Sequence, residues 1–156
     1  MLLRCILFVT ICCVDVTTPG RAADPFPADT DFARNAEQAC SQEIDDARLA
    51  ITKSNDPMVR DVAKRMQDDG TAETQQLAAL AVEKGWPAAA LNPTDTWSRY
   101  SDHRYVLRQI RAQQNAIALY TEEAANGADT KLQEFARKTL PVLRQRLESL
   151  RLLRTS

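Results

Sequence analysis

Four positions at which a polar residue or a glycine interrupts an otherwise apolar helical stripe are the candidates for chemistry in this sequence. They lie near the middles of four segments with helical periodicity, and they are Glu43, Gly70, Gln113 and Arg146. A buried carboxylate must be paired or neutralised, and an arginine offers it two parallel N–H donors. We therefore predict a buried ion pair between Glu43 and Arg146.

In this interpretation, Gln113 satisfies the hydrogen bonds that the ion pair leaves open, and Gly70 leaves room for the guanidinium group. Together the four positions form a polar cluster at one level of the core. The alternative is that Glu43 and Arg146 lie at the edges of their stripes and extend their charged ends into water. The spacing of the residues leaves both arrangements open.

Metal chemistry has few ligands available in this chain. His103 is the single histidine, and a carboxylate-bridged di-metal site in a helical bundle needs glutamates combined with Glu-x-x-His pairs. This sequence contains no such pair. We therefore predict no metal, no cofactor and no catalytic residues. The alternative is a metal-binding or redox enzyme of ferritin-like type that uses the core carboxylates Glu43, Glu73 and Glu123.

The first 22 residues have the layout of a signal peptide. A short basic start is followed by ten apolar residues at 5–14, by helix-breaking residues at 17–20, and by the small residues Gly20 and Ala22. The apolar run is well short of the roughly 20 residues that span a bilayer. We predict cleavage after residue 22, a periplasmic or secreted protein, and no stable membrane insertion afterwards. The alternative is an uncleaved membrane anchor.

Cysteine usage follows from that cleavage. Three of the four cysteines lie within the predicted signal peptide, so Cys40 alone remains and an intramolecular disulfide is impossible. A single thiol in an exported protein is either buried and inert or a possible intermolecular thiol. The second possibility would make the protein an assembly module that dimerises through Cys40.

Composition narrows the class of protein and its partners. A chain of 156 residues with 44% hydrophobic and 26% charged residues is typical of one globular domain. The 20 basic and 21 acidic residues give a net charge of −1, which argues against a nucleic-acid-binding protein. The predicted partner is an unknown envelope protein or a second copy of the chain, and not nucleic acid.

Four helices are needed to position these residues. Apolar residues recur every three or four positions, and they predict helices over roughly 30–54, 57–84, 102–126 and 129–153. Asp29 or Thr30 is the expected cap of the first helix. Asp56, Pro57 and Gly85 are typical of the two ends of the second helix. Residues 23–30 are predicted to be a disordered lead-in, and residues 31–154 to form the domain.

The connections predict how the helices are arranged. Short links join the first helix to the second and the third to the fourth, whereas residues 86–101 form one long connection between the two hairpins. The expected fold is all-α, a ferritin-like antiparallel four-helix bundle with a long loop between helices 2 and 3.

Several segments of the chain resemble the bacterial envelope family named domain of unknown function 4142, which forms ferritin-like four-helix bundles. The segments that carry the resemblance are Glu43–Ala50, Asn55–Trp86, Ile117–Gly127 and Leu132–Leu147. The resemblance implies histidines that look like metal ligands at three positions, which in this chain hold Gly70, Gln113 and Arg146. The family's glutamate is retained as Glu43. The chain therefore resembles a divergent member that lacks the family's histidines.

Together these observations predict an exported bacterial envelope protein of uncharacterised role. The expected function is that of a non-catalytic binding or structural helical bundle with a degenerate metal site.

Overall fold

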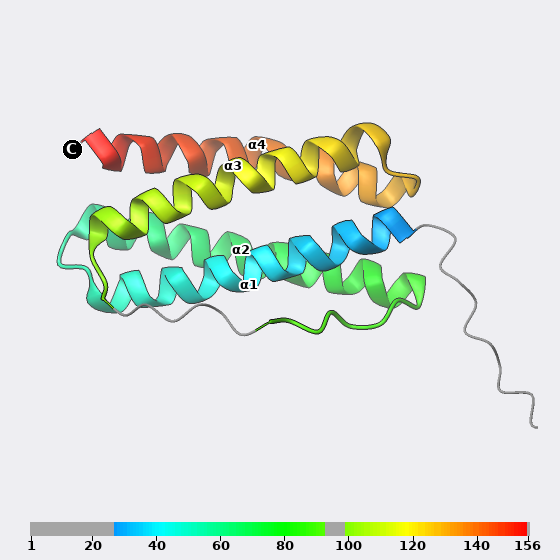
Figure 1. Cartoon of the computed structure of the whole chain (residues 1–156), viewed down its shortest axis with the longest axis horizontal. Helices are drawn as coiled ribbons and strands as arrows, with labels where there is room; N and C mark the ends of the chain where they lie inside the picture. Colours follow the sequence, from blue (N-terminus) through cyan, green and yellow to red (C-terminus); the bar gives the residue numbers. More distant parts are fainter. Residues whose placement is uncertain (1–26, 93–98, 156) are drawn as a thin grey trace, which may run out of the picture.

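Four long helices make up the part of the chain that the computed structural model describes, residues 27–92 and 99–155 (Figure 1). Their bounds are Pro27–Lys53 for α1, Pro57–Lys84 for α2, Asp102–Asn126 for α3 and Thr130–Thr155 for α4. At a rise of 1.5 Å per residue, each helix is about 40 Å long. The described residues contain no strand, and the predicted all-α class is confirmed.

The helices form two antiparallel hairpins that pack against each other. The most extensive contacts are those of α1 with α2 and of α3 with α4, and the hairpins meet where α1 lies beside α3 and α2 beside α4. The order around the bundle is therefore α1, α2, α4, α3. In this order α1 lies diagonally opposite α4, and α2 lies diagonally opposite α3.

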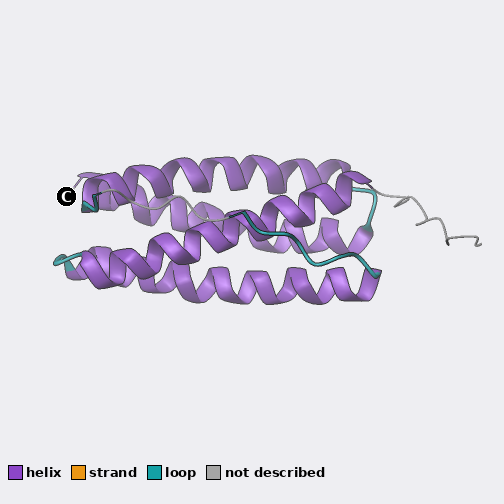
Figure 2. Ribbon diagram, turned by 60° about the horizontal axis from the view of Figure 1, so that its bottom comes forward, coloured by secondary structure: helices purple, strands orange, loops and turns teal. Residues whose placement is uncertain are grey.

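The long connection between the hairpins decides the direction of the second hairpin. α2 ends at one end of the bundle and α3 begins at the other, so α2 and α3 run in the same direction (Figures 1 and 2). A crossover of this kind is typical of ferritin-like bundles. The structure thus confirms the predicted four-helix bundle with its long loop between helices 2 and 3.

Local sequence signals set both ends of α2. The Asp56 carboxylate accepts a hydrogen bond from the Met58 backbone N–H at 2.8 Å, and Pro57 occupies the first helical position. Gly85 ends the helix in the left-handed conformation, with φ of 68°, which costs glycine little because it has no Cβ. The bounds of α2 and α3 are those that the sequence predicted.

The start of α1 differs from the prediction. The helix begins at Pro27, so residues 27–30 are helical and do not belong to a disordered lead-in. Asp29, an expected cap of α1, is fully buried within the first turn of that helix. It accepts hydrogen bonds from the backbone N–H groups of Ala128 at 3.0 Å and Asp129 at 2.7 Å. This contact joins α1 to the α3–α4 turn. The residues around Asp29 in the sequence do not predict it, because its partners lie about 100 residues away. The predicted signal peptide and residues 23–26 lie outside the described residues.

The apolar core has two parts with a polar layer between them. One part lies toward the α1–α2 link and is built around Met66, Tyr105 and Leu150. The other lies toward the α3–α4 turn and is built around Leu77 and Tyr120, among others. Along every helix, the residues between the two parts include buried polar side chains or a glycine. The four sequence candidates all occupy this middle layer.

None of the described helices holds an apolar stretch long enough to cross a lipid bilayer. The described start of the crossover is tied to α1 by Gln38, whose side chain donates to the Asn92 carbonyl at 3.3 Å and accepts from the Asn92 N–H at 2.6 Å.

Replacing Asp29 with alanine tests the contact between α1 and the α3–α4 turn. The change leaves two backbone N–H groups without their acceptor, so we expect Asp29→Ala to lower the free energy of unfolding by about 1–3 kcal/mol. Asp31→Ala is the matched control, because Asp31 is exposed on the same helix and pairs with Arg34. Urea unfolding of both variants measures the difference, and equal losses would contradict the assigned role of Asp29.

Candidate functional site

Arg146 of α4 lies at the centre of the polar layer, between carboxylates of α1 and α2. Its Nη1 donates to Glu43 Oε1 at 3.0 Å and to Glu73 Oε2 at 3.3 Å, and its Nε donates to Asp69 Oδ2 at 3.3 Å. The side chains of Arg146, Glu43 and Glu73 are only 5–8% exposed. The predicted Glu43–Arg146 pair is therefore present and buried, and the alternative of water-exposed stripe edges is wrong. Since α1 and α4 are diagonal neighbours, the pair crosses the bundle.

The other two sequence candidates lie against the same glutamate. The Gln113 amide of α3 donates to Glu43 Oε2. A Cβ atom added to Gly70 would lie 3.6 Å from Glu43 Oε1 and 3.3 Å from Ile44 Cγ1. Gly70 thus leaves room for the side chains of α1, and not for the guanidinium group as predicted. The structure brings all four positions together around Glu43.

Glu73 extends the network across the second diagonal, from α2 to α3. Its Oε1 accepts a hydrogen bond from the Tyr120 hydroxyl, while its Oε2 faces Arg146. The pair prediction missed Glu73 and Tyr120. The signal for Glu73 was its place on the helical line of Met66, Gly70 and Leu77, all of which are buried. Both diagonals of the bundle are therefore closed by buried polar contacts.

Asp69 of α2 lies at the rim of the network. Its side chain is 46% exposed, yet it accepts from the Arg146 guanidinium. Its neighbour Asp68 does point outward and pairs with Lys64. Adjacent carboxylates differ in this way because successive helix positions are rotated by about 100°.

A second buried carboxylate, Asp46, lies one turn beyond Glu43 on α1. Its Oδ2 accepts from Gln109 Nε2 at 2.9 Å and from Arg108 Nε at 2.7 Å, and its Oδ1 accepts from Gln42 Nε2 at 3.1 Å. Sequence analysis did not single out Asp46. Its spacing from Glu43 on the buried face of α1 was the available signal. This second ion pair strengthens the contact between α1 and α3.

Cys40 lies within the same layer and is closed off from solvent. It is 6% exposed. Burial, followed by the nearby carboxylates of Glu73 and Glu43, raises the pKa of its thiol well above the usual range. A protonated thiol in this position cannot reach a second chain while the bundle is folded. The structure therefore favours the buried, inert interpretation over dimerisation through Cys40.

The carboxylates proposed for a metal enzyme do not assemble. Glu43 and Glu73 meet at Arg146, whereas Glu123 lies near Asp29 and Asp129 at the α3–α4 turn. Among residues 27–92 and 99–155, no three His, Cys, Asp or Glu side chains come together as a metal site would require. The position between Glu43 and Glu73 holds a guanidinium cation. The residues present therefore do not fit the metal ion that the family resemblance implies.

The network carries more negative than positive charge. Three carboxylates, those of Glu43, Glu73 and Asp69, share the single guanidinium of Arg146. Burial raises the pKa of Glu43, Arg146 and the Gln113 amide oppose the shift, and the Glu73 and Asp69 carboxylates add to it, so that the net pKa is about 7. Burial alone would lower the pKa of Arg146, but the three carboxylates outweigh it and raise that pKa overall. The centre of the bundle therefore holds a proton-accepting carboxylate.

A groove between α2 and α4 leads from the surface to this network. Its volume is about 260 Å³, and its lining includes Asp69 and Glu73 of α2 and Arg146 of α4. Lys138 and Thr139 lie on the α4 side. Solutes therefore have a route to two of the buried ionic groups.

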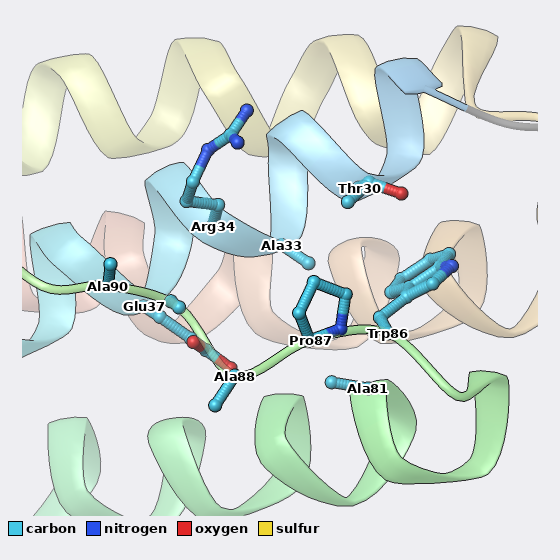
Figure 3. Close-up of a pocket in the computed structure, with 10 residues that line it drawn as sticks. Thr30, Ala33, Arg34, Glu37, Ala81, Trp86, Pro87, Ala88 and Ala90 are labelled. Carbon is cyan, nitrogen blue, oxygen red and sulfur yellow. The ribbon is translucent and has the colours of Figure 1, made fainter. Parts of the chain in front are cut away.

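A different pocket lies between the start of α1, the end of α2 and the beginning of the crossover (Figure 3). Its volume is about 230 Å³, and Trp86, Pro87, Ala33 and Thr30 surround it, while Arg34 points away from Pro87 and Trp86. None of the network residues lines this pocket. It is a feature of the crossover and is separate from the polar layer.

Comparison with known proteins agrees with this geometry at the level of fold. Residues 15–153 match a family model described as Domain of unknown function (DUF4142). A crystal structure of a DUF305 fragment from Deinococcus radiodurans is similar, with a TM-score of 0.73 and 16% identity. The similarity covers 85% of this chain and 99% of the fragment, and at this identity it shows the fold alone. No curated protein matches the sequence.

Removing the central cation tests the network. Arg146→Ala leaves Glu43 and Glu73 buried without their partner, so we expect it to lower the free energy of unfolding by about 3–5 kcal/mol at pH 8. The double variant Glu43→Ala with Arg146→Ala is expected to recover part of this loss. Arg144→Ala, at an exposed site on the same helix, serves as the control. A loss below about 0.5 kcal/mol for Arg146→Ala would show that the pair contributes nothing.

The pKa of Glu43 also predicts how stability depends on pH. Its folded value of about 7 lies above the ordinary value of 4.5, so between these pH values the folded chain binds more protons than the unfolded chain. The contribution of protonated Glu43 to the free energy of unfolding is complete below about pH 4.5 and is lost as the pH rises through 7. Glu43→Gln removes this titrating group. We therefore expect the free energy of unfolding of the variant to fall less steeply between pH 5 and 7. The difference in slope should approach that of one proton, about 1.4 kcal/mol per pH unit. Chemical unfolding at several pH values measures this slope, and identical slopes would refute the assignment.

Proposed function

The chain belongs to the family described as domain of unknown function DUF4142, and from this premise we propose that it is an exported, non-catalytic helical bundle of the bacterial envelope. It acts by binding or by structural association, and its polar layer is a degenerate metal site in which an arginine supplies the positive charge. No cofactor is required for this role.

The Arg146 guanidinium between Glu43 and Glu73 is the observation that carries the proposal. The family resemblance implies histidine ligands where this chain has Gly70, Gln113 and Arg146. A guanidinium group keeps its charge at all physiological pH values and forms directional hydrogen bonds. It neither exchanges with solution nor changes oxidation state. In this chain the polar layer would therefore cross-link the helices and would not carry out metal chemistry.

The N-terminal sequence supports the proposed location. Its basic start, its ten-residue apolar run and the small residues at 20 and 22 are typical of an export signal. An envelope protein built this way would meet its partner through surface grooves. The groove between α2 and α4 is suited to such contact, because it leads to ionic groups that are already fixed by the network. The proposed partner is an envelope protein or a second copy of the chain.

Metal content and thermal melting test the proposal. We expect the purified protein to hold less than about 0.1 equivalent of transition metal by elemental mass spectrometry. Its melting temperature should stay unchanged after chelation or addition of Fe, Zn, Mn or Cu. The triple variant Gly70→His, Gln113→His and Arg146→His places three imidazoles around Glu43, so it should gain a metal-dependent increase in melting temperature.

The same three positions changed to alanine provide the matched control, which removes the arginine without adding ligands. A metal-dependent shift in the histidine variant alone would identify the polar layer as the remnant of a metal site. A stoichiometric metal that stabilises the unaltered protein would overturn the proposal and favour the metal enzyme. If neither triple variant responds to metal, the four positions do not form a metal geometry and the degenerate-site interpretation fails.

A further inference from the structure

An acidic groove runs between α1 and α3 at the end of the bundle where α1 begins and α3 ends (Figure 1). Its volume is about 300 Å³. Asp31, Glu122 and Glu123 supply its carboxylates, and Phe32 and Leu119 supply apolar surface. No lysine or arginine lines it. The groove therefore combines negative charge with a wall that suits hydrocarbon.

Glu123 holds a buried acceptor that lacks a donor. The residue is 5% exposed, and its Oε1 has no hydrogen-bond partner among the described residues. The carboxyl group lies against Gly127, where an added Cβ would collide with it, and both residues line the groove. Buried acceptors are nearly always satisfied. An acceptor left open at the wall of a groove indicates that a donor arrives from outside.

The local charges favour a positively charged donor. α1, α2 and α4 each carry a basic residue in the last turn, whereas α3 carries none there and has Glu122 and Glu123 near its end. The C-terminus of a helix has partial negative charge and attracts cations. Arg137 of α4 does donate to the Ala124 carbonyl at 2.7 Å, but it does not line the groove. Asp31 of the groove pairs with Arg34, but no lysine or arginine lines the groove beside Glu122 and Glu123.

The surrounding groups add to this effect. Burial, followed by the carboxylates of Asp29 and Asp129, raises the pKa of Glu123 to about 7. Lys84, a nearby cation, is already paired with Asp129. A ligand that is positively charged at neutral pH would favour the ionised form of Glu123. Binding would then compete with protonation.

The shape of the groove favours an organic cation over a metal ion. No three of the described acidic or other ligating residues converge on one point as metal coordination requires. Phe32 and Leu119 offer contact for a short hydrocarbon chain, which a metal ion does not have. We propose that the α1–α3 groove binds a primary ammonium group on a short aliphatic chain, with the Glu123 carboxylate as its acceptor. Such a group is found on a free alkylamine and on a lysine side chain of a partner protein.

Titration of the purified protein with pentylammonium chloride tests this inference. We expect saturable shifts of the backbone amide resonances of groove residues in two-dimensional ¹⁵N–¹H spectra at millimolar ligand, at pH 8. Glu123→Gln should weaken binding at least tenfold. The matched control is Glu134→Gln, because Glu134 is an exposed glutamate of α4 that pairs with Lys138, and it should leave the affinity unchanged. Affinity should fall about tenfold per pH unit below 7 as Glu123 takes up a proton.

Three parallel titrations separate the possible outcomes. Pentanol tests the apolar wall alone, and binding as tight as that of pentylammonium would overturn the proposal. Calcium chloride tests an inorganic ion, and equal shifts of the same resonances would overturn it as well. Nα-acetyl-lysine amide distinguishes the sources: tighter binding than pentylammonium indicates a partner's lysine, and weaker binding indicates a free amine.

A second variant guards against loss of the fold. If Glu123→Gln fails to fold, Glu122→Gln decides, because Glu122 is exposed and lines the same groove. It should weaken pentylammonium binding at least threefold. Unchanged binding in a folded Glu123→Gln or Glu122→Gln protein, or no resonance shift at 50 mM ligand, would refute the proposed site.

Discussion

One arginine shared by carboxylates of two other helices is the interaction around which the structure is organised. Arg146 reaches from α4 to Glu43 on the diagonally opposite helix and to Glu73 on the adjacent one. Tyr120 then links Glu73 to α3. A single connected network therefore contacts all four helices at one level. Apolar packing lies on both sides of this level and excludes water from it.

A buried network of this kind contributes more to specificity than to net stability. Removing charged groups from water costs several kcal/mol per ion, and the attraction between them offsets that cost only when the geometry is good. The benefit of the network is that it sets the axial position of each helix relative to its neighbours. Sliding one helix by a turn would leave Glu43 or Arg146 facing the apolar side chains above or below the layer. The alanines and leucines of the two core parts would still contact apolar neighbours after such a shift, whereas the ionic groups would lose their partners.

The interior of the bundle has too many acceptors for its donors, and the imbalance lies along α3. The Oε1 atoms of Gln109, Gln113 and Glu123 are all buried without a hydrogen-bond partner among the described residues. Two of the carboxylates in this interior, Glu43 and Glu123, have a pKa raised to about 7. Protons, water or ligand cations are the species that can balance such an interior. The grooves at α2–α4 and α1–α3 show where they can enter.

The sequence by itself determined the helices, their connections and the level of the polar layer. Periodicity together with local end signals placed α2 and α3 at their observed bounds, because Asp56 and Gly85 cap α2 and Ser101 caps the start of α3. The interruptions of the stripes identified Glu43, Gln113 and Arg146, because a polar residue on a buried face is conspicuous in any single helix.

Tertiary structure decided what periodicity cannot show: that Asp29 binds the α3–α4 turn, that Glu73 and Asp69 share Arg146, and that Glu123 lies apart from them. The periodicity of a helix predicts which way a side chain faces. The rotation and axial offset of neighbouring helices decide which atoms come within hydrogen-bonding distance, and a single helix does not encode these.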